Sequence, residues 1–209
     1  MLVKSLISVF LAAILTANYV LSKFLGICPF LGVSKKLNTA VGMSAAVTFV
    51  MVLATAVTYP IYQYLLVPNS LDYLQTIVFI LIIAGLVQLV EIVLKKYIPS
   101  LYQSLGVYLP LITTNCAILG VTMLVLQKMD TTTAYTYTYG HALVNALGAG
   151  IGFALAMVLF AGIREQLSLV NIPKGMDGMA IALVTAGLLA MAFMGFSGVD
   201  KGLATLFGI

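Results

Sequence analysis

The feature that most limits the possible folds of this chain is a series of apolar runs, each about 20 residues long. A helix that rises about 1.5 Å per residue needs about 20 residues to cross the hydrocarbon core of a bilayer, which is about 30 Å thick. Of the 209 residues, 62% are hydrophobic and only 8% are charged. This composition excludes a soluble globular domain and predicts a polytopic membrane protein.

Six membrane spans are predicted, at 5–24, 39–64, 73–94, 101–127, 141–163 and 178–198. All six are expected to be helices, because an isolated strand cannot satisfy its backbone hydrogen bonds in lipid. Another apolar stretch, 24–33, is interrupted by Gly26, Pro29 and Gly32 and is too short to cross. We expect it to form a broken helix or a re-entrant turn. The run that follows Lys4 lacks a cleavage motif and is therefore predicted to be retained.

The distribution of basic residues predicts the orientation of the chain. One side of the membrane receives Lys23, Lys35, Lys36, Lys95, Lys96, Arg164 and Lys174, and the other side receives Lys4, Lys128 and Lys201. Cytoplasmic loops carry the excess of Lys and Arg, so both termini are predicted to face outward, with 131–139 as an outer loop. The net charge of +4 comes from these scattered anchors. They form no basic face, so membrane lipid is an expected partner and nucleic acid is not.

The two halves of the chain carry matching segments. The segment 28–33 (CPFLGV) matches 116–121 (CAILGV), and the further matches are 40–42 with 146–148, 51–53 with 157–159, and 84–86 with 186–188. We therefore predict a single membrane domain, 1–209, made of repeats at approximately 1–98 and 99–209. Three spans is an odd number, so the second repeat enters from the opposite side and the repeat is inverted. Cys28 and Cys116 are then equivalent residues, expected near the midplane with broken helices around them.

Four roles are open for Cys28 and Cys116 on the residues alone. Both could be small buried apolar side chains, or they could form a disulfide, although no further cysteine indicates an oxidising scaffold. Zinc prefers four Cys or His ligands, and the only histidine is His141. A [2Fe–2S] cluster usually takes four thiolates, so a second chain would have to supply two. The chain has no Gly-rich phosphate loop, which argues against its binding a nucleotide or flavin.

Two other classes of function also remain open. Inverted repeats and broken helices are typical of secondary transporters and of ion-channel-like subunits that have no redox centre. If the chain were only a structural scaffold for other subunits, both cysteines could be replaced freely. Glu91 is the candidate carboxylate for ion coupling, but a surface pair with Lys95 also explains it, and Arg164 with Glu165 is interpreted in the same way. Neutral polar side chains in the spans are expected to bond between helices: Asn18, Thr113, Thr114, Asn115 and Asn145.

Four longer motifs resemble a known family of membrane subunits. They are 24–36 (FLGICPFLGVSKK), 109–121 (LPLITTNCAILGV), 157–165 (MVLFAGIRE) and 192–198 (AFMGFSG). These motifs are similar to those of the A-subunit family of the Rnf ion-translocating ferredoxin:NAD+ oxidoreductase, and the resemblance covers nearly the whole chain. The E subunit of the same complex is similar too, as are the D and E subunits of the sodium-pumping NADH:quinone reductase. The sequence departs from the family pattern at 131–139 and 200–209.

The resemblance implies a six-helix protein in a bacterial or archaeal cytoplasmic (inner) membrane. It implies a paralogous six-helix partner, the E subunit, in opposite orientation, and a [2Fe–2S] cluster shared by the two chains at the centre of the membrane. Cys28 and Cys116 would be the ligands from this chain, which has no catalytic residue of its own. With the B, C, D and G subunits, the complex passes electrons from ferredoxin to NAD+ and couples this flow to Na+ or H+ transport. Apolar residues would keep water from the thiolates, namely Phe24, Phe30, Leu31 and Ile118.

Overall fold

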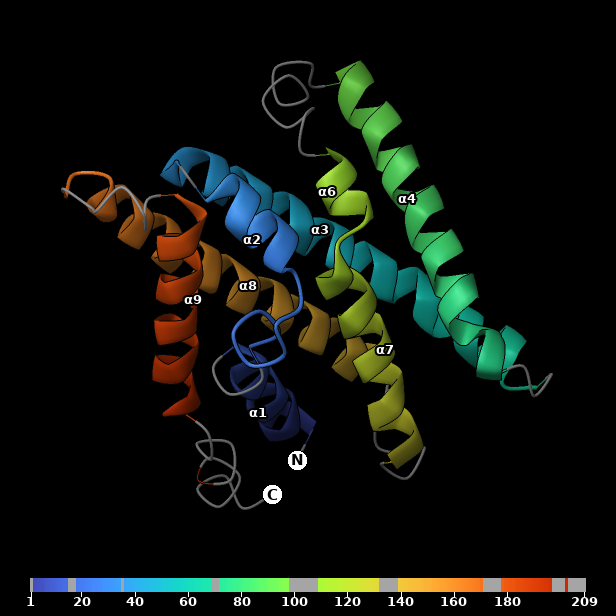
Figure 1. Cartoon of the computed structure of the whole chain (residues 1–209). Coiled ribbons are helices and arrows are strands. Elements are labelled where there is room, and N and C mark those ends of the chain that lie inside the picture. The colour runs from blue at the N-terminus through green and yellow to red at the C-terminus, as the bar shows by residue number, and fades with distance from the viewer. Residues whose placement is uncertain are drawn as a thin grey trace.

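The computed structural model describes residues 2–14, 18–34, 36–68, 72–97, 109–131, 139–170, 178–196 and 202. Within these residues the chain is all-helical, as Figure 1 shows, so the predicted all-α class is confirmed. Three helices are long and apolar enough to cross a membrane, namely Leu37–Leu66, Gln75–Val93 and Tyr139–Leu167. Shorter apolar helices occupy Leu111–Leu126 and Met179–Met194. The predicted outer loop 131–139 lies largely outside the described residues.

In the described residues, each half of the chain has two shorter helices, then a long helix, then a further helix. The first half contains α1 (Leu2–Ile14), α2 (Ile27–Val33), α3 (Leu37–Ile61) with its π-helical extension η1 (Tyr62–Leu66), the 3-10 turn η2 (Asp72–Leu74) and α4 (Gln75–Tyr97). The second half contains α6 (Leu109–Thr113), α7 (Cys116–Thr131), α8 (Tyr139–Leu167) and α9 (Met179–Met194). Each half therefore has short helical pieces, then a long helix, then a final helix.

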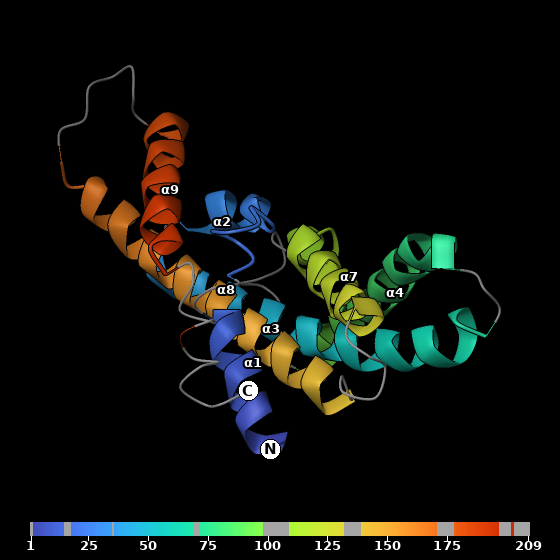
Figure 2. The ribbon, with the colours of Figure 1, turned by 90° about the horizontal axis from the view of Figure 1, so that it is seen from below.

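The long helices α3 and α8 run antiparallel along each other and make the largest contact between described helices (Figures 1 and 2). Glycines allow this approach: a Cβ added at Gly150 would lie 2.5 Å from the Thr48 methyl group on α3. At Gly148 it would lie 2.9 Å from the Ala13 Cβ on α1. Small residues at such crossings are how membrane helices gain packing energy, because lipid supplies no hydrophobic drive between helices.

The remaining helices are arranged around this central pair. Helix α4 lies beside α7 near one end of the pair, and α9 lies beside α8 near the other end (Figures 1 and 2). The short helices α2 and α6 contact each other. Only 17% of the apolar window of α4 is buried within the chain, so its outward side chains face lipid or another protein chain. The fold thus places α2, which carries Cys28, against α6, the short helix that precedes the Cys116 helix.

Two predicted spans differ from the observed helices. The span 5–24 is helical only up to Ile14, and the described residues from 18 to 26 form turns. The Asn18 side-chain oxygen accepts hydrogen bonds from the backbone N–H groups of Val20 and Leu21, a local pattern that competes with a helix. The predicted span 101–127 also contains a break in its described part, between Thr113 and Cys116, which agrees with the predicted broken helices around the cysteines.

Candidate metal centre

Cys28 lies in the first turn of α2, immediately after a tightly turned segment. Phe24 and Gly26 both have positive φ, 55° and 85°, so the backbone is left-handed just before α2 begins at Ile27. Glycine adopts this conformation without a steric penalty, whereas other residues avoid it. The Leu25 N–H donates to the Tyr19 carbonyl at 2.9 Å and closes the turn. The result is an outward-facing thiol: Cys28 is exposed.

Cys116 is the first residue of α7, at the second break in the chain. Asn115 precedes it and caps the helix, because its Oδ1 accepts a hydrogen bond from the Ala117 N–H at 3.0 Å. The Asn115 N–H donates to the Ile112 carbonyl at 3.3 Å, which joins the end of α6 to the start of α7. Cys116 is half-buried and free of any disulfide, as is Cys28.

One hydrogen bond connects the two cysteine motifs. The backbone N–H of Gly26 donates to Cys116 Sγ at 2.9 Å, across 90 positions of sequence. Gly26 is two residues before Cys28, so the Cys116 sulfur lies against the turn that leads into the Cys28 helix. A Cβ on Gly26 would lie 3.0 Å from the Ala117 Cβ, 3.1 Å from the Phe153 ring and 3.3 Å from Asn115 Oδ1. Only glycine fits both the backbone angle and this space.

Arg164 of α8 holds the other end of the Cys28 helix. Its Nη1 donates to the Leu31 carbonyl and to Ser34 Oγ, both at 2.8 Å. The carbonyls of a last helical turn lack partners within the helix, and a cation there also suits the helix dipole. Arg164 therefore fixes α2 against α8. The prediction that Arg164 serves in a surface pair with Glu165 is wrong, because its partners lie on the Cys28 segment.

Aromatic stacking strengthens the same contact. Phe30 of α2 stacks on Phe160 of α8, with ring centroids 4.2 Å apart, and the Arg164 guanidinium lies 5.8 Å from the centre of the Phe160 ring. Of the predicted apolar wall, Phe30 and Ile118 are fully buried and Leu31 is partly buried. Phe24 is 60% exposed on this chain. Three of the four side chains therefore build the core behind the cysteines, while Phe24 faces outward.

The neutral polar residues predicted in the spans mostly join elements to one another. Asn18 Nδ2 donates to the Gly152 carbonyl on α8 at 2.9 Å, and Asn145 Nδ2 donates to the Tyr19 hydroxyl at 3.4 Å. Asn18, Asn145 and Asn115 are all buried. The first two fasten the turn before α2 onto α8, as expected for polar groups between membrane helices. Asn115 Nδ2 and Asn145 Oδ1 are each buried without a hydrogen-bond partner among the described residues, and of the two only Asn115 Nδ2 is a donor.

The donor set suits a soft metal held together with another chain. Among the described residues, no cluster of three or more His, Cys, Asp or Glu side chains forms, and His141 is buried on α8. A closed zinc site of four ligands is therefore not built by these residues. Two free thiols and a backbone N–H that donates to one sulfur are donors that fit half of a thiolate-bound iron–sulfur site.

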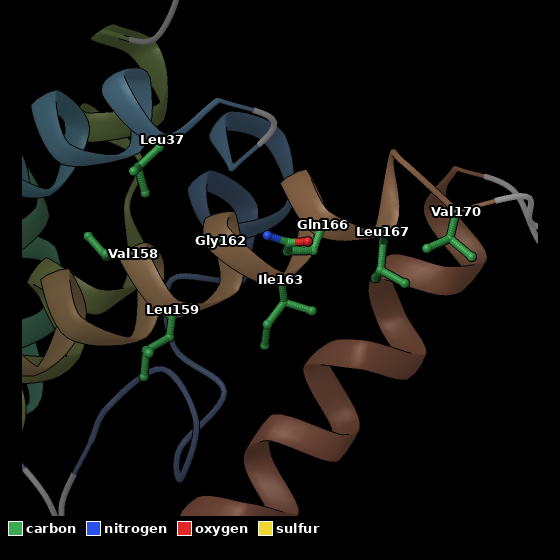
Figure 3. A pocket seen from close by; sticks show the side chains of 8 residues that line it. All are labelled: Leu37, Val158, Leu159, Gly162, Ile163, Gln166, Leu167 and Val170. Atoms are coloured by element: carbon green, nitrogen blue, oxygen red, sulfur yellow. The ribbon is translucent and has the colours of Figure 1, made fainter.

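Two apolar grooves on the α3 and α8 faces lie apart from the thiols. One, of about 620 Å³, is lined by Leu37 of α3 and by α8 and the turn that follows it, and Gln166 is its only polar side chain (Figure 3). The other, of about 540 Å³, lies between α3 and α8 and shares Val158 with the first. Neither groove has a cysteine, histidine or carboxylate in its lining. The chemistry of this part of the chain is thus concentrated at the cysteine turns.

Two contacts of this site have no local sequence signal. The first is the Gly26 N–H to Cys116 Sγ bond, and the second is the pair of bonds from Arg164 to Leu31 and Ser34, called here the Arg164 clamp. Each joins residues at least 90 positions apart. A glycine two residues before one cysteine indicates a turn, but it does not indicate which sulfur the turn will contact. A basic residue at the end of an apolar helix indicates a membrane anchor, and nothing near it in the sequence indicates a carbonyl partner in the other half of the chain.

The described architecture is that of a helical membrane protein with one free cysteine at the start of each of two short or broken helices. A family model described as Rnf-Nqr subunit, membrane protein, matches residues 6–200. The A subunit of the Na(+)-translocating ferredoxin:NAD(+) oxidoreductase complex of Acetobacterium woodii is 59% identical over 198 residues, covering 95% of this chain and 100% of that protein. The A subunit of the ion-translocating oxidoreductase complex of Syntrophotalea carbinolica is 53% identical, with 95% and 100% covered. The chain belongs to the Rnf-Nqr family of membrane subunits.

Proposed function

We propose that this chain is the A subunit of an ion-translocating ferredoxin:NAD+ oxidoreductase complex and that it holds half of an intramembrane [2Fe–2S] cluster. The observation that carries the proposal is the Gly26 N–H to Cys116 Sγ bond, which joins the two cysteine motifs. The names of the relatives support the complex. The pair of free thiols supports the cluster.

The function of such a cluster follows from distance. Electron tunnelling across about 30 Å of hydrocarbon is very slow, and a carrier midway divides the path into two shorter steps. When bound, the cluster supplies one-electron chemistry. The residues of this chain would bind it through Cys28 and Cys116, orient the thiolates through the Gly26 turn and the Arg164 clamp, and exclude water with Phe30 and Ile118. The electron flow is proposed to be coupled to transport of Na+ or H+.

A partner chain completes the site in this proposal. Two thiolates leave an iron–sulfur cluster with two open positions, and Cys28 is exposed on this chain. We propose that a paralogous six-helix protein, the E subunit, covers Cys28 in opposite orientation and contributes two more thiolates. The B, C, D and G subunits would complete the complex.

The partner can be tested by affinity purification. A complex isolated through a tag on this chain, in mild detergent, is expected to contain a homologous membrane protein in equal amount, identified by mass spectrometry, and to absorb visible light. A matched purification of the Cys28→Ser variant is expected to lose the absorbance. A monomer that carries a complete cluster would contradict the shared site, and a pair of identical chains would replace the paralogue by a second copy.

The inverted repeat belongs to the same proposal. The short helices α1 and α2 would correspond to α6 and α7, the long helix α3 to α8, and α4 to α9. The proposed repeats are 1–98 and 99–209, with six spans in all and both termini outside the cytoplasm of a bacterial or archaeal inner membrane. The antiparallel course of α3 and α8 (Figure 1) supports this relation, since equivalent helices of inverted repeats run in opposite directions.

The orientation can be measured with a reporter that is active only in the cytoplasm. Fusions after Lys36, Lys96 or Lys174 are expected to be active, because the basic excess marks the cytoplasmic side. Fusions after Tyr139 or at the C-terminus are expected to be inactive, and these serve as the matched controls. The reverse pattern would contradict the assignment of both termini to the outside.

A further inference from the structure

The Asn115 side chain carries a buried donor that nothing in the described part of the chain satisfies. Asn115 is 4% exposed, and its Nδ2 has no hydrogen-bond partner among the described residues. Its backbone N–H donates to the Ile112 carbonyl, and its carbonyl accepts from the Ile118 N–H. A buried donor without an acceptor destabilises the fold, because it has given up its hydrogen bond to water. Such an atom in a native protein calls for an explanation.

The orientation of this amide is fixed by its other end. Asn115 Oδ1 accepts from the Ala117 N–H at 3.0 Å. Rotating the amide by half a turn would place Nδ2 against that N–H, donor against donor, so the nitrogen must occupy the other position. The orphaned atom is therefore a donor, and what it lacks is an acceptor.

The amide lies next to the cysteine turns, where sulfur is the acceptor that a bound cluster would supply. Asn115 Oδ1 lies 3.3 Å from the position that a Cβ on Gly26 would take. The N–H of the same glycine donates to Cys116 Sγ at 2.9 Å. The amide and the Gly26 N–H thus border the residue that carries the thiol. A cluster bound to Cys116 would bring both thiolate and sulfide sulfur atoms to this place, and these accept hydrogen bonds.

We propose that Asn115 is a positioning residue whose side-chain amide, together with the Gly26 N–H, donates hydrogen bonds to the sulfur atoms at Cys116 and raises the reduction potential of the cluster. This inference rests on the proposed function. Reduction adds one electron, which the upstream carrier loses, and no bond is made or broken. Because the electron adds negative charge near the sulfur atoms, N–H donors stabilise the reduced form more than the oxidised form.

The two cysteines differ in this respect. Cys28 is followed by Pro29, which has no backbone N–H to offer, and no hydrogen bond to Cys28 Sγ is found within the described residues. Cys116 is followed by Ala117, and the donors that the described structure offers gather on its side. The Cys116 side of the cluster is therefore the one at which this chain sets the potential.

The test is a redox titration of the purified complex followed by EPR. The variant Asn115→Ser keeps an oxygen that caps α7 but loses the amide donor. We expect a reduced-to-oxidised ratio about tenfold lower at a fixed ambient potential, which for a one-electron couple is about 59 mV. Thr55→Val removes a buried hydroxyl that donates to the Met51 carbonyl of its own helix α3, away from the cysteine turns, and is expected to leave the potential unchanged. An unchanged potential in Asn115→Ser, with its iron retained, would overturn the inference, since a residue that only caps the helix would behave in this way.

A second measurement needs no substitution and covers the case in which Asn115→Ser does not assemble. In the wild-type complex grown with asparagine carrying ¹⁵N in its side-chain amide, pulsed EPR is expected to detect a weak coupling of the reduced cluster to that nitrogen. Absence of the coupling would overturn the role of Asn115 while leaving the cluster intact. Absence of iron from the wild-type complex would instead overturn the proposed function.

Discussion

Replacing Cys28 or Cys116 with serine is expected to abolish the iron signal of the membrane part of the complex and the ferredoxin-dependent reduction of NAD+. Serine has nearly the same volume as cysteine but lacks the soft ligand atom that iron prefers. Iron per complex, the visible spectrum and NADH formation should fall together in both variants. The measurement is made on membranes in which the complex is shown to assemble.

The competing explanation treats the cysteines as small buried side chains. Under that explanation each serine would cost about 1–3 kcal/mol for a hydroxyl in an apolar place, and activity would survive. Ala142→Ser provides the matched control, because Ala142 is fully buried on α8 and the variant adds a hydroxyl without touching a thiol. Full iron and full activity in the double serine variant would end the cluster proposal.

Gly26→Ala is expected to have the second largest effect. The left-handed backbone at φ 85° costs a residue with a Cβ roughly 1–2 kcal/mol. Crowding against Ala117 and Phe153, at 3.0 and 3.1 Å, adds about 1–3 kcal/mol. The new methyl group would also push the Gly26 N–H away from Cys116 Sγ. We expect a lower melting temperature of the complex, measured in detergent, and a reduced iron content.

The control for this substitution is Gly42→Ala on α3. Nothing lies within 4 Å of a Cβ at Gly42, and alanine in the middle of a helix is favoured over glycine by roughly 0.5–1 kcal/mol. Gly42→Ala is therefore expected to leave stability unchanged or slightly higher and to retain iron. If Gly26→Ala behaved like Gly42→Ala, the tight turn before α2 would not be needed to hold the site.

The long helices were predictable because each corresponds to one long, continuous run of apolar residues in the sequence. The spans 39–64, 73–94, 141–163 and 178–198 each overlap one main helix, and their ends differ by a few residues. Apolar runs of this length leave the backbone no other way to satisfy its hydrogen bonds in lipid. The break around the first cysteine was also predictable, since Gly26 and Pro29 both disfavour a continuous helix there.

The positions of the helix ends near the cysteines were harder to predict. An apolar run continues from 5 to 24, yet the described residues from 18 onward form turns, where the Asn18 side chain bonds to the backbone two and three residues on and to Gly152 of α8. A single asparagine in an apolar run does not reveal such a distant partner. The same limit applies to Arg164, whose partner Leu31 lies in the other half of the chain.

The most direct test of the central claim is an iron and acid-labile sulfide analysis, combined with EPR, of the complex purified through this chain. The predicted result is iron and sulfide in equal amounts in the membrane part of the complex, after the other subunits have been removed. An EPR signal of the membrane part should also appear on one-electron reduction. A membrane part without iron, taken from a complex that still transfers electrons from ferredoxin to NAD+, would contradict the account.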